Sequence, residues 1–455
     1  MDKAKVLGEN KIPSLLWQFS LPAIGGNLVN VLYNIVDSIF VGHGVGEIGL
    51  TAVTIAFPLM SLLMAIGLLV GVGASTLVSI RLGEQNKDAA DLILGNAVTM
   101  LLVFVIISTG AALLFLDPLL IKLGATPEVL PYTHDFVVVI LWGSVFLHLG
   151  GGLGGVVQAQ GDPKMALIAM LISGVLNTIL NPILIVGLNL GIKGSAWATV
   201  IAQAASAICI LVYFIRGMGT LKLKLRNLVL QYRIVIDIIK IGLSLFLMQV
   251  SNSVVMFLFN NSLIVYGGEL AVASFGIINR MMMLVMMPVM GLTQAAQPII
   301  GYNFGAKQFD RVLETLKIVL TLAVCAGAVG VVIIYMLATP IIHLFNGGEE
   351  MVAIGSVGLK VFLVMMPLIG FQVIGASYFQ AVGKAGYTIV LNLLRQVILL
   401  IPLVIILPMT FGLMGIWAAG PISDFVSALL TSVFLYREMR KLSSENRVVC
   451  QENIT

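Results

Sequence analysis

The first long apolar segment of this chain carries a stripe of polar side chains. Its members, Asn27, Asn30, Asn34 and Asp37, are spaced by three, four and three residues, which places them on one face of a helix. Moving an ionised carboxylate into hydrocarbon costs roughly 3 kcal/mol or more, so a membrane helix turns such a group toward protein or water. Carboxylate and amide oxygens are hard ligands that suit a proton or Na⁺. We interpret the outer end of this stripe, Asn34 and Asp37, as part of a cation site.

Three further polar residues are predicted to lie at the same depth. Asn177 and Asn181 occur one turn apart in the fifth apolar segment, and Thr199 follows in the sixth. Counted at about 1.5 Å per residue from the outer ends of their segments, these groups and Asp37 share one level in the outer half of the bilayer. The simpler interpretation is that such polar groups only hold neighbouring helices together. We expect a cation-coupling site made of Asn34, Asp37, Asn177, Asn181 and Thr199.

The elements that must position these residues follow from composition. Of the 455 residues, 59% are hydrophobic and only 10% are charged, whereas a soluble protein has roughly 25% charged residues. Apolar runs recur from end to end and leave no room for a sizeable soluble domain. The expected fold class is therefore an all-α polytopic membrane protein. We predict twelve transmembrane helices, at roughly residues 14–41, 51–80, 92–116, 132–157, 164–187, 194–215, 236–265, 270–300, 313–338, 354–380, 386–408 and 412–436.

Basic residues are distributed unequally between the two sides of the membrane. Twenty of the 25 Lys and Arg residues fall in one set of connections, which places that set and both termini in the cytoplasm. The net charge of +4 is modest and requires no nucleic-acid partner. The expected organisation is an N-terminal six-helix lobe at 1–220 with the cation site, a basic cytoplasmic linker at 221–235, a C-terminal six-helix lobe at 236–440 and a cytoplasmic tail at 441–455.

The two halves of the sequence repeat each other at an offset of 222 residues. Gly46-Glu47 pairs with Gly268-Glu269, and Pro118 pairs with Pro340. Matches of this kind on one diagonal indicate an internal repeat. Because each half has an even number of spans, the lobes should be related by a pseudo-two-fold axis along the membrane normal. Alternating access then follows as rocking of one lobe against the other.

The predicted cation-site residues are not repeated. At the same offset they fall on apolar residues or proline: Met256, Phe259, Leu399, Leu403 and Pro421. The polar constellation therefore belongs to the N-terminal lobe only. The inner part of the stripe is repeated, since the counterparts of Asn27 and Asn30 are polar. These counterparts are Gln249 and Asn252.

The eighth span is rich in methionine, with six Met residues between positions 281 and 290. Flexible, polarizable Met side chains suit promiscuous apolar ligands, although they also serve as ordinary packing residues. We expect a substrate cavity lined by this span and by the inner polar stripe, with the residues Asn30, Tyr33, Gln249, Asn252, Met256, Arg280, Met282 and Met286.

Two charged residues lie well inside spans of the second lobe. Arg395 and Asp424 are predicted at similar depth. We interpret them as a structural ion pair, with a second proton-linked site as the alternative. His148, inside the fourth span, is interpreted as a core residue. The sequence has no Walker A, H-E-x-x-H or G-x-S-x-G motif, which argues against ATP as the energy source and against an enzyme. We expect no cofactor beyond a coupling ion.

Several short motifs, in their order and spacing, resemble the multidrug and toxic compound extrusion (MATE) family over nearly the whole chain. They are Leu32-Tyr33-Asn34 with Asp37, Gln158-Ala159-Gln160-Gly161-Asp162, Leu176-Asn177 with Asn181-Pro182, the stretch from Gly194 to Thr199, and the arginines Arg280 and Arg395. The resemblance implies V-shaped states and export of organic cations driven by inward Na⁺ or H⁺. It also implies a cation site at Asp37, Asn177 and Thr199. The chain departs from the family at Asn181, where many prokaryotic members carry Asp.

We therefore expect secondary active multidrug efflux, in which inward-moving H⁺ or Na⁺ is exchanged for lipophilic or cationic organic compounds. A single carboxylate favours one-for-one exchange with H⁺, or a weaker Na⁺ site. The alternative function is a lipid-linked precursor flippase of the related superfamily, which needs a strongly cationic central cavity. We expect a monomer in a prokaryotic cell (inner) membrane. Its expected partners are small organic drugs, the coupling cation and membrane lipids.

Overall fold

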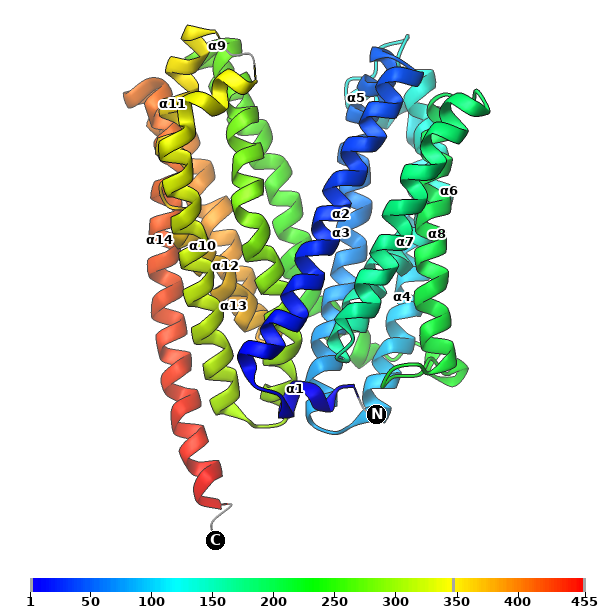
Figure 1. The fold of residues 1–455 in the computed structure, drawn as a ribbon, viewed down its shortest axis with the longest axis vertical. Coiled ribbons are helices and arrows are strands. Elements are labelled where there is room, and N and C mark those ends of the chain that lie inside the picture. The colour runs from blue at the N-terminus through cyan, green and yellow to red at the C-terminus, as the bar shows by residue number, and fades with distance from the viewer. Residues whose placement is uncertain (1–2, 346–347, 453–455) are drawn as a thin grey trace. The chain divides into compact units, whose positions relative to one another are not determined.

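The computed structural model describes residues 3–345 and 348–452 (Figure 1). Within these stretches all regular secondary structure is helical. The helices up to the linker are α1 (Lys5–Glu9), α2 (Ile12–Gly44), α3 (Glu47–Gly83), α4 (Lys87–Leu114), α5 (Leu116–Lys122), α6 (Leu130–Ala159), α7 (Pro163–Pro182), η1 (Ile183–Gly187), α8 (Ile192–Arg216) and η2 (Leu225–Leu228). They are followed by α9 (Tyr232–Gly305), α10 (Phe309–Leu344), α11 (Glu349–Leu363), α12 (Met366–Ala381), α13 (Ala385–Leu393), η3 (Leu394–Leu400) and α14 (Ile401–Glu452).

The predicted number of spans is confirmed. The described residues hold nine helical stretches that are long and apolar enough to cross a membrane, and one bent pair, α11 with α12. Of the nine, α9 has 74 residues, about 110 Å of helix, whereas the hydrocarbon core is about 30 Å thick. It breaks at Gly268 (φ 66°), and α14 breaks at Gly412 (φ 55°), a backbone region that glycine tolerates. Each break divides one stretch into two spans, and the bent pair of α11 and α12 adds one more span. The nine stretches therefore correspond to twelve spans.

The helix breaks also correct the internal repeat. Gly46 and Gly268 both have a positive φ, 84° and 66°, and lie 222 residues apart. Gly191 and Gly412 share another backbone conformation (φ 55° and ψ −133°, φ 55° and ψ −139°), but they lie 221 residues apart. The second half is therefore one residue shorter before its last span. The counterpart of Thr199 is Gly420, and the predicted match to Pro421 is wrong.

Packing divides the chain into two units, which are described separately. Unit 1 contains the residues up to Asn10 together with Leu21–Phe246, and unit 2 contains Lys11–Ser20 together with the residues from Leu247 onward. The first turns of α9 pack within unit 1, because a Cβ added to Gly242 would lie 1.7 Å from the carbonyl oxygen of Leu69. The domain boundaries drawn from the sequence stay a prediction.

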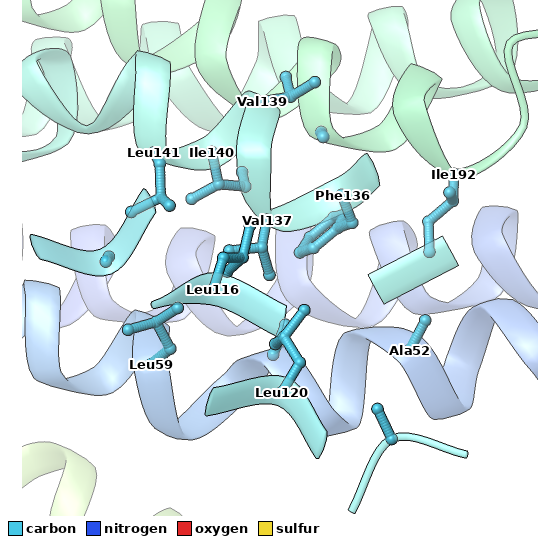
Figure 2. Close-up of a cluster of buried hydrophobic side chains, with 14 of the residues drawn as sticks. Ala52, Leu59, Leu116, Leu120, Phe136, Val137, Val139, Ile140, Leu141 and Ile192 are labelled. Atoms are coloured by element: carbon cyan, nitrogen blue, oxygen red, sulfur yellow. The ribbon is translucent and has the colours of Figure 1, made fainter. Parts of the chain in front are cut away.

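The core of unit 1 forms where α3, α5, α6 and α8 meet (Figure 2). Leu120 of α5 is fully buried, and Phe136 of α6 and Ile192 of α8 are nearly so. Helices α3 and α6 approach closely at two glycines, since a Cβ on Gly71 would lie 2.7 Å from the Cα of Gly152. This contact leaves no room for a side chain at Gly71, and it accounts for glycine there even though glycine lowers helix stability.

The linker between α8 and α9 is fixed to α4. Asn96 accepts a hydrogen bond from the backbone N–H of Gln231 at 2.7 Å. The buried Asp91 accepts the backbone N–H of Lys222 at 2.9 Å and forms an ion pair with Lys224 at 2.7 Å. The hydrogen bond that Lys224 donates to Asp91, together with the negative charge of Asp91, raises the pKa of Lys224. The predicted basic linker is thus a packed part of unit 1.

Candidate functional site

Three helices of unit 1 bring four of the five predicted cation-site residues together. Helix α2 carries Asp37, α7 carries Asn177 and Asn181 one turn apart, and α8 carries Thr199. Only η1 and a short turn separate α7 from α8, so the two helices lie side by side (Figure 1). The spacing of four residues directs both α7 amides to the same face of that helix.

Glycines allow these three helices to approach closely. A Cβ on Gly174 of α7 would lie 2.4 Å from the side chain of Val29 on α2. A Cβ on Gly194 of α8 would lie 2.7 Å from the backbone of Leu184, just after α7. Any larger residue at these positions would push α2 and α8 away from α7, and the polar side chains would no longer reach one another.

Hydrogen bonds link the polar groups into one cluster. Ser195 Oγ donates to Asp37 Oδ1 at 2.8 Å. Asn181 Nδ2 donates to Asn177 Oδ1, and Asn177 Nδ2 donates to Thr199 Oγ1, both at 3.1 Å. The Asn181 side chain also interacts with the Asp37 carboxylate. We call Asp37, Asn177, Asn181, Ser195 and Thr199 the oxygen cluster.

The oxygen cluster is largely shielded from solvent. Asn181 and Ser195 are fully buried, Asn177 is nearly so, and Asp37 is half-buried. The carbonyl oxygen of the Asn181 side chain is enclosed and accepts no hydrogen bond within the described residues. Leaving such an acceptor without a donor costs about 1–3 kcal/mol. An O–H donor or a hard cation is the kind of partner that would satisfy this oxygen.

The chemistry of the oxygen cluster is that of a site with one carboxylate. No group of three His, Cys, Asp or Glu side chains placed to hold a metal occurs in the part of the chain that the structure describes. The potential ligand atoms around Asp37 are amide and hydroxyl oxygens, which suit H⁺ or Na⁺ better than soft or transition metals. The cluster therefore contains one group that can carry a negative charge, the carboxyl group of Asp37.

The structure adds Ser195 to the predicted residues and separates Asn34 from them. Ser195 lies one helical turn before Thr199 on the same face of α8. This spacing was the signal in the sequence that could have identified it. Asn34 is exposed, and its side-chain amide donates to the backbone oxygen of Asn30 at 2.6 Å. Asn34 stays a predicted site residue, but its described hydrogen bonds remain within α2.

The predicted substrate-cavity residues are divided between the units. Asn30 and Tyr33 are half-buried residues of α2 in unit 1. The other six belong to unit 2: Gln249, Asn252, Met256, Arg280, Met282 and Met286. Among these, Met286 is buried and Met256 is exposed, while the Asn252 carbonyl accepts a hydrogen bond from Gln396 at 2.6 Å. The exposed Arg280 lies over the ring of Phe345 at 5.6 Å. The cavity itself stays a prediction.

Arg395 and Asp424 form an ion pair in unit 2. Arg395 Nε donates to Asp424 Oδ1 at 2.7 Å, and the hydroxyl of Ser423 donates to the backbone oxygen of Arg395 at 2.7 Å. Arg395 lies in the π-helical turn η3, whose wider backbone leaves its carbonyl available to Ser423. His148 of α6 is buried, and its Nδ1 lies 2.7 Å from the backbone oxygen of Ser144.

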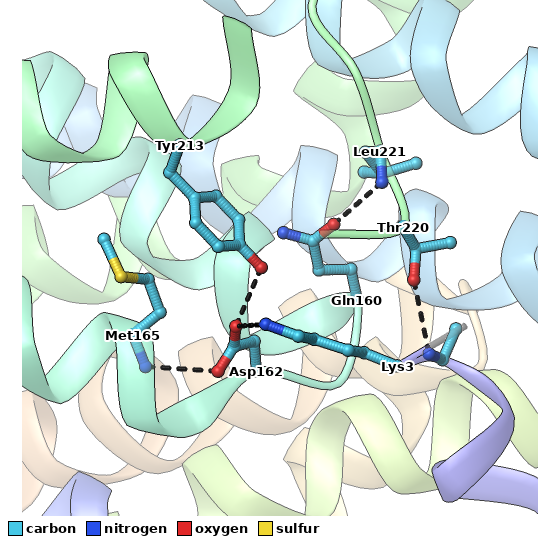
Figure 3. A network of polar contacts seen from close by, with 8 residues as sticks. Lys3, Gln160, Asp162, Met165, Tyr213, Thr220 and Leu221 are labelled. Carbon is cyan, nitrogen blue, oxygen red and sulfur yellow. Dashed lines mark hydrogen bonds and ion pairs between the residues drawn. The ribbon is translucent and has the colours of Figure 1, made fainter. Parts of the chain in front are cut away.

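A second polar network in unit 1 surrounds Asp162 at the turn between α6 and α7 (Figure 3). The carboxylate caps α7 by accepting the N–H of Met165 at 3.2 Å. It also accepts the hydroxyl of Tyr213 at 2.8 Å and the ammonium group of Lys3. The adjoining Gln160 accepts the N–H of Leu221 at 2.9 Å. The segment preceding α1 is thereby tied to this turn, a contact that the sequence did not indicate.

Comparisons with known proteins agree with this architecture. A family model described as MatE matches residues 22–183 and 241–406, one stretch in each half of the chain. The multidrug export protein MepA of Staphylococcus haemolyticus is 30% identical over 436 residues, covering 96% of each chain. MepA of Staphylococcus aureus (strain MSSA476) is 28% identical over 92% of this chain and 93% of its own.

Solved structures show the same fold. A MATE crystal structure in the bent conformation superposes with a TM-score of 0.92 at 25% identity, over 98% of this chain and 99% of its own. An outward-facing multidrug resistance MATE transporter of the MOP superfamily gives a TM-score of 0.90 at 25% identity, with the same coverage. The described helices are thus arranged as in a known class of membrane transporters.

Proposed function

Because this chain belongs to the MatE family, we propose that it exports lipophilic or cationic organic compounds in exchange for inward-moving H⁺ or Na⁺. The efflux part of the proposal is supported by relatives that are named multidrug export proteins. The coupling part rests on one observation, the hydrogen-bonded oxygen cluster around the carboxylate of Asp37.

Asp37 is the group whose charge changes during the cycle. When the coupling ion is H⁺, protonated Asp37 gains an O–H donor, and the side-chain oxygen of Asn181, which has no partner within the described residues, is available as an acceptor once the amide turns toward it. When the coupling ion is Na⁺, the same two oxygens serve as ligands. In both cases the cation removes the cost of a charged carboxylate between helices.

The other members of the oxygen cluster orient these two groups. Ser195 holds one carboxylate oxygen of Asp37, and Thr199 fixes the Asn177 amide, which in turn directs Asn181. Binding energy is converted into transport only when the ion binds one conformation of the protein better than another. A cluster built from three helices has this property, because any relative movement of α2, α7 and α8 separates its donors from its acceptors.

Substrate binding is assigned to the predicted cavity residues, with Met side chains as adaptable apolar contacts. Release of the compound on the outer side accompanies entry of the cation at Asp37. The protein acts as a transporter with no covalent step, in a multi-pass arrangement in the prokaryotic cell membrane with both termini in the cytoplasm.

Ethidium efflux tests the proposal. Cells that lack their own pumps express the wild type, Asp37→Asn or the control Asp237→Asn, which removes an exposed carboxylate at the start of α9. Efflux is followed under separate H⁺ and Na⁺ gradients. We expect Asp37→Asn to lose more than 90% of gradient-driven efflux and Asp237→Asn to keep it. A tenfold loss corresponds to about 1.4 kcal/mol of free energy. Unimpaired efflux by Asp37→Asn contradicts the coupling role. Failure of the wild type to export any compound in a broad panel contradicts multidrug efflux.

A further inference from the structure

The cytoplasmic end of α14 carries two arginines without carboxylate partners. Arg437 and Arg440 are exposed and lie one turn apart. Within the described residues neither forms an ion pair, although the neighbouring Glu438 is paired with Lys384 and Lys441 with Glu445. The guanidinium group of Arg440 lies over the ring of Tyr436 at 4.9 Å, a cation–π contact that fixes its position.

These arginines border a hollow on the surface of unit 2. Its volume is about 590 Å³, and it is lined by Ser432, Val433, Tyr436, Arg437 and Arg440. The last residue of the predicted twelfth span is Tyr436, so both guanidinium groups lie just beyond the apolar segment. Tyr side chains are typical of the level of lipid head groups. The hollow therefore combines two guanidinium groups that form no ion pair within the described residues, a hydroxyl-bearing ring and an apolar wall.

An exposed apolar stripe leads along α14 to this hollow. Phe425, Leu429, Val433 and Tyr436 follow one another at steps of four, four and three residues, and each is at least 43% exposed. This spacing puts them on one face of the helix. The stripe ends where the arginines begin, so apolar and cationic surfaces are joined end to end. The C-terminal end of helix α14 continues beyond the end of the neighbouring α10 (Figure 1).

The equivalent helix of unit 1, α8, repeats the apolar stripe but not the full set of polar groups: Ile208, Val212 and Ile215 are exposed and lead to the exposed Arg216. In the corrected register Arg437 corresponds to Arg216, the last residue of α8, and Arg440 corresponds to Gly219, beyond its end. The counterparts of Ser432 and Tyr436 are Leu211 and Ile215. The serine, the tyrosine and the second arginine that line the hollow therefore occur on α14 and not at the equivalent positions of α8.

We propose that this hollow binds one anionic phospholipid, with the phosphate between Arg437 and Arg440 and an acyl chain along Phe425, Leu429 and Val433. Guanidinium groups are suited to phosphate because they present several N–H donors in a planar fork. The stripe gives the ligand its apolar part, which distinguishes a phospholipid from a free phosphate. The proposal does not depend on the coupling ion or on the exported compound.

Native mass spectrometry of the delipidated full-length protein tests this site. The protein in detergent is titrated with dioleoyl phosphatidylglycerol and, separately, with dioleoyl phosphatidylcholine, which has the same acyl chains and no net charge. Three forms are compared: the wild type, Arg437→Gln/Arg440→Gln, and the charge-matched control Arg216→Gln/Arg226→Gln on unit 1. Thermal unfolding in phosphatidylcholine shows whether each variant remains folded.

We expect the wild type to bind one phosphatidylglycerol well above the affinity for phosphatidylcholine. The Arg437→Gln/Arg440→Gln variant should bind it about 30-fold more weakly, as expected for the loss of two basic contacts with an anionic lipid, and the control should stay within about threefold of the wild type. Equal loss in the control, equal affinity for the two lipids, or an unchanged Arg437→Gln/Arg440→Gln variant would overturn the proposal. Displacement of the lipid by equimolar glycerol 1-phosphate would overturn it in favour of a free-phosphate site.

Discussion

The two units fill one repeat position with opposite chemistry. The position lies nine residues before Gly46 in unit 1 and nine residues before Gly268 in unit 2. It is occupied by Asp37 in unit 1 and by Phe259 in unit 2. Asp37 is half-buried and accepts a hydrogen bond from Ser195 at 2.8 Å. Phe259 is 1% exposed, stacks on Phe275 with ring centroids 4.9 Å apart, and meets Phe362 edge-on at 5.7 Å.

This difference shows that equivalent positions of a duplicated fold can serve apolar packing in one half and a polar cluster in the other. The aromatic cluster of unit 2 (Phe259, Phe275, Phe362 and Trp417) is stabilised by apolar burial and ring contacts, which do not change with ion concentration. The oxygen cluster of unit 1 contains a carboxyl group and, within the described residues, a side-chain oxygen without a hydrogen-bond donor, so a bound cation would lower its free energy. We infer that unit 1 responds to the ion while the equivalent region of unit 2 is stabilised by packing alone.

The strongest test of this comparison places a carboxylate in unit 2. Phe259→Asp removes a buried ring and inserts a charge among apolar side chains, which should destabilise the protein by about 5 kcal/mol or more. We expect little folded protein, measured as the monodisperse fraction in detergent. The control Phe259→Leu keeps an apolar group and should fold with a modestly lower unfolding temperature. Normal folding of Phe259→Asp would show that this region tolerates a charge as unit 1 does.

The next largest effect should come from the ion pair of unit 2. Asp424→Asn leaves Arg395 without its charged partner inside the helix bundle and should cost about 3–5 kcal/mol, seen as a lower unfolding temperature. Replacing both residues, as Arg395→Met/Asp424→Leu, should recover most of this loss and keep ion-driven efflux. If the double variant is stable but no longer coupled, the pair is a second proton-linked site.

Removing one donor from the oxygen cluster should have an intermediate effect. Ser195→Ala takes away the hydrogen bond to Asp37, worth about 1.5–3 kcal/mol for a charged acceptor, and should lower the apparent affinity for the coupling ion at least roughly tenfold. Ser195→Thr keeps the hydroxyl and should retain the affinity. Ser206→Ala, which removes another buried hydroxyl of α8, serves as the control in the same ion titration. An unchanged affinity in Ser195→Ala would remove this residue from the site.

The smallest expected effect concerns the turns at Gly161 and Gly383, where the units carry opposite charges. Asp162 of unit 1 pairs with Lys3, and its counterpart Lys384 of unit 2 pairs with Glu438. Lys3 is the more exposed of the two lysines, at 40% against 28%. Lys3→Gln should therefore cost no more than about 1 kcal/mol, and Lys384→Gln should cost more. Thermal unfolding of both variants decides the order, and the reverse order would contradict the burial argument.

The sequence predicts the fold well because membrane helices follow from composition and charge. Twelve apolar segments and their boundaries could be located since each must span the hydrocarbon on its own. The one-residue difference between the halves could not be located, because it lies in a region where neither half has a strong motif. It became visible only from the matching backbone angles of Gly191 and Gly412.

The candidate site could be predicted in part. Charged and amide residues such as Asp37 and Asn177 are conspicuous in apolar segments, whereas a serine such as Ser195 is common there, and its spacing of one helical turn from Thr199 is the signal that could have identified it. Asn34 shares a helix face with Asp37, but its amide finds a closer acceptor in its own helix. Contacts such as Lys3 with Asp162 join residues 159 positions apart, and no local pattern indicates them.

Uphill uptake in proteoliposomes measures the coupling claim most directly. Purified protein is reconstituted without other pumps, and accumulation of ethidium is driven by an imposed H⁺ gradient or, separately, by an imposed Na⁺ gradient. We predict that the wild type accumulates the compound under at least one gradient, that Arg395→Met/Asp424→Leu does so too, and that Asp37→Asn only equilibrates it. Accumulation by Asp37→Asn at the wild-type level would contradict the assignment of ion coupling to the oxygen cluster of unit 1.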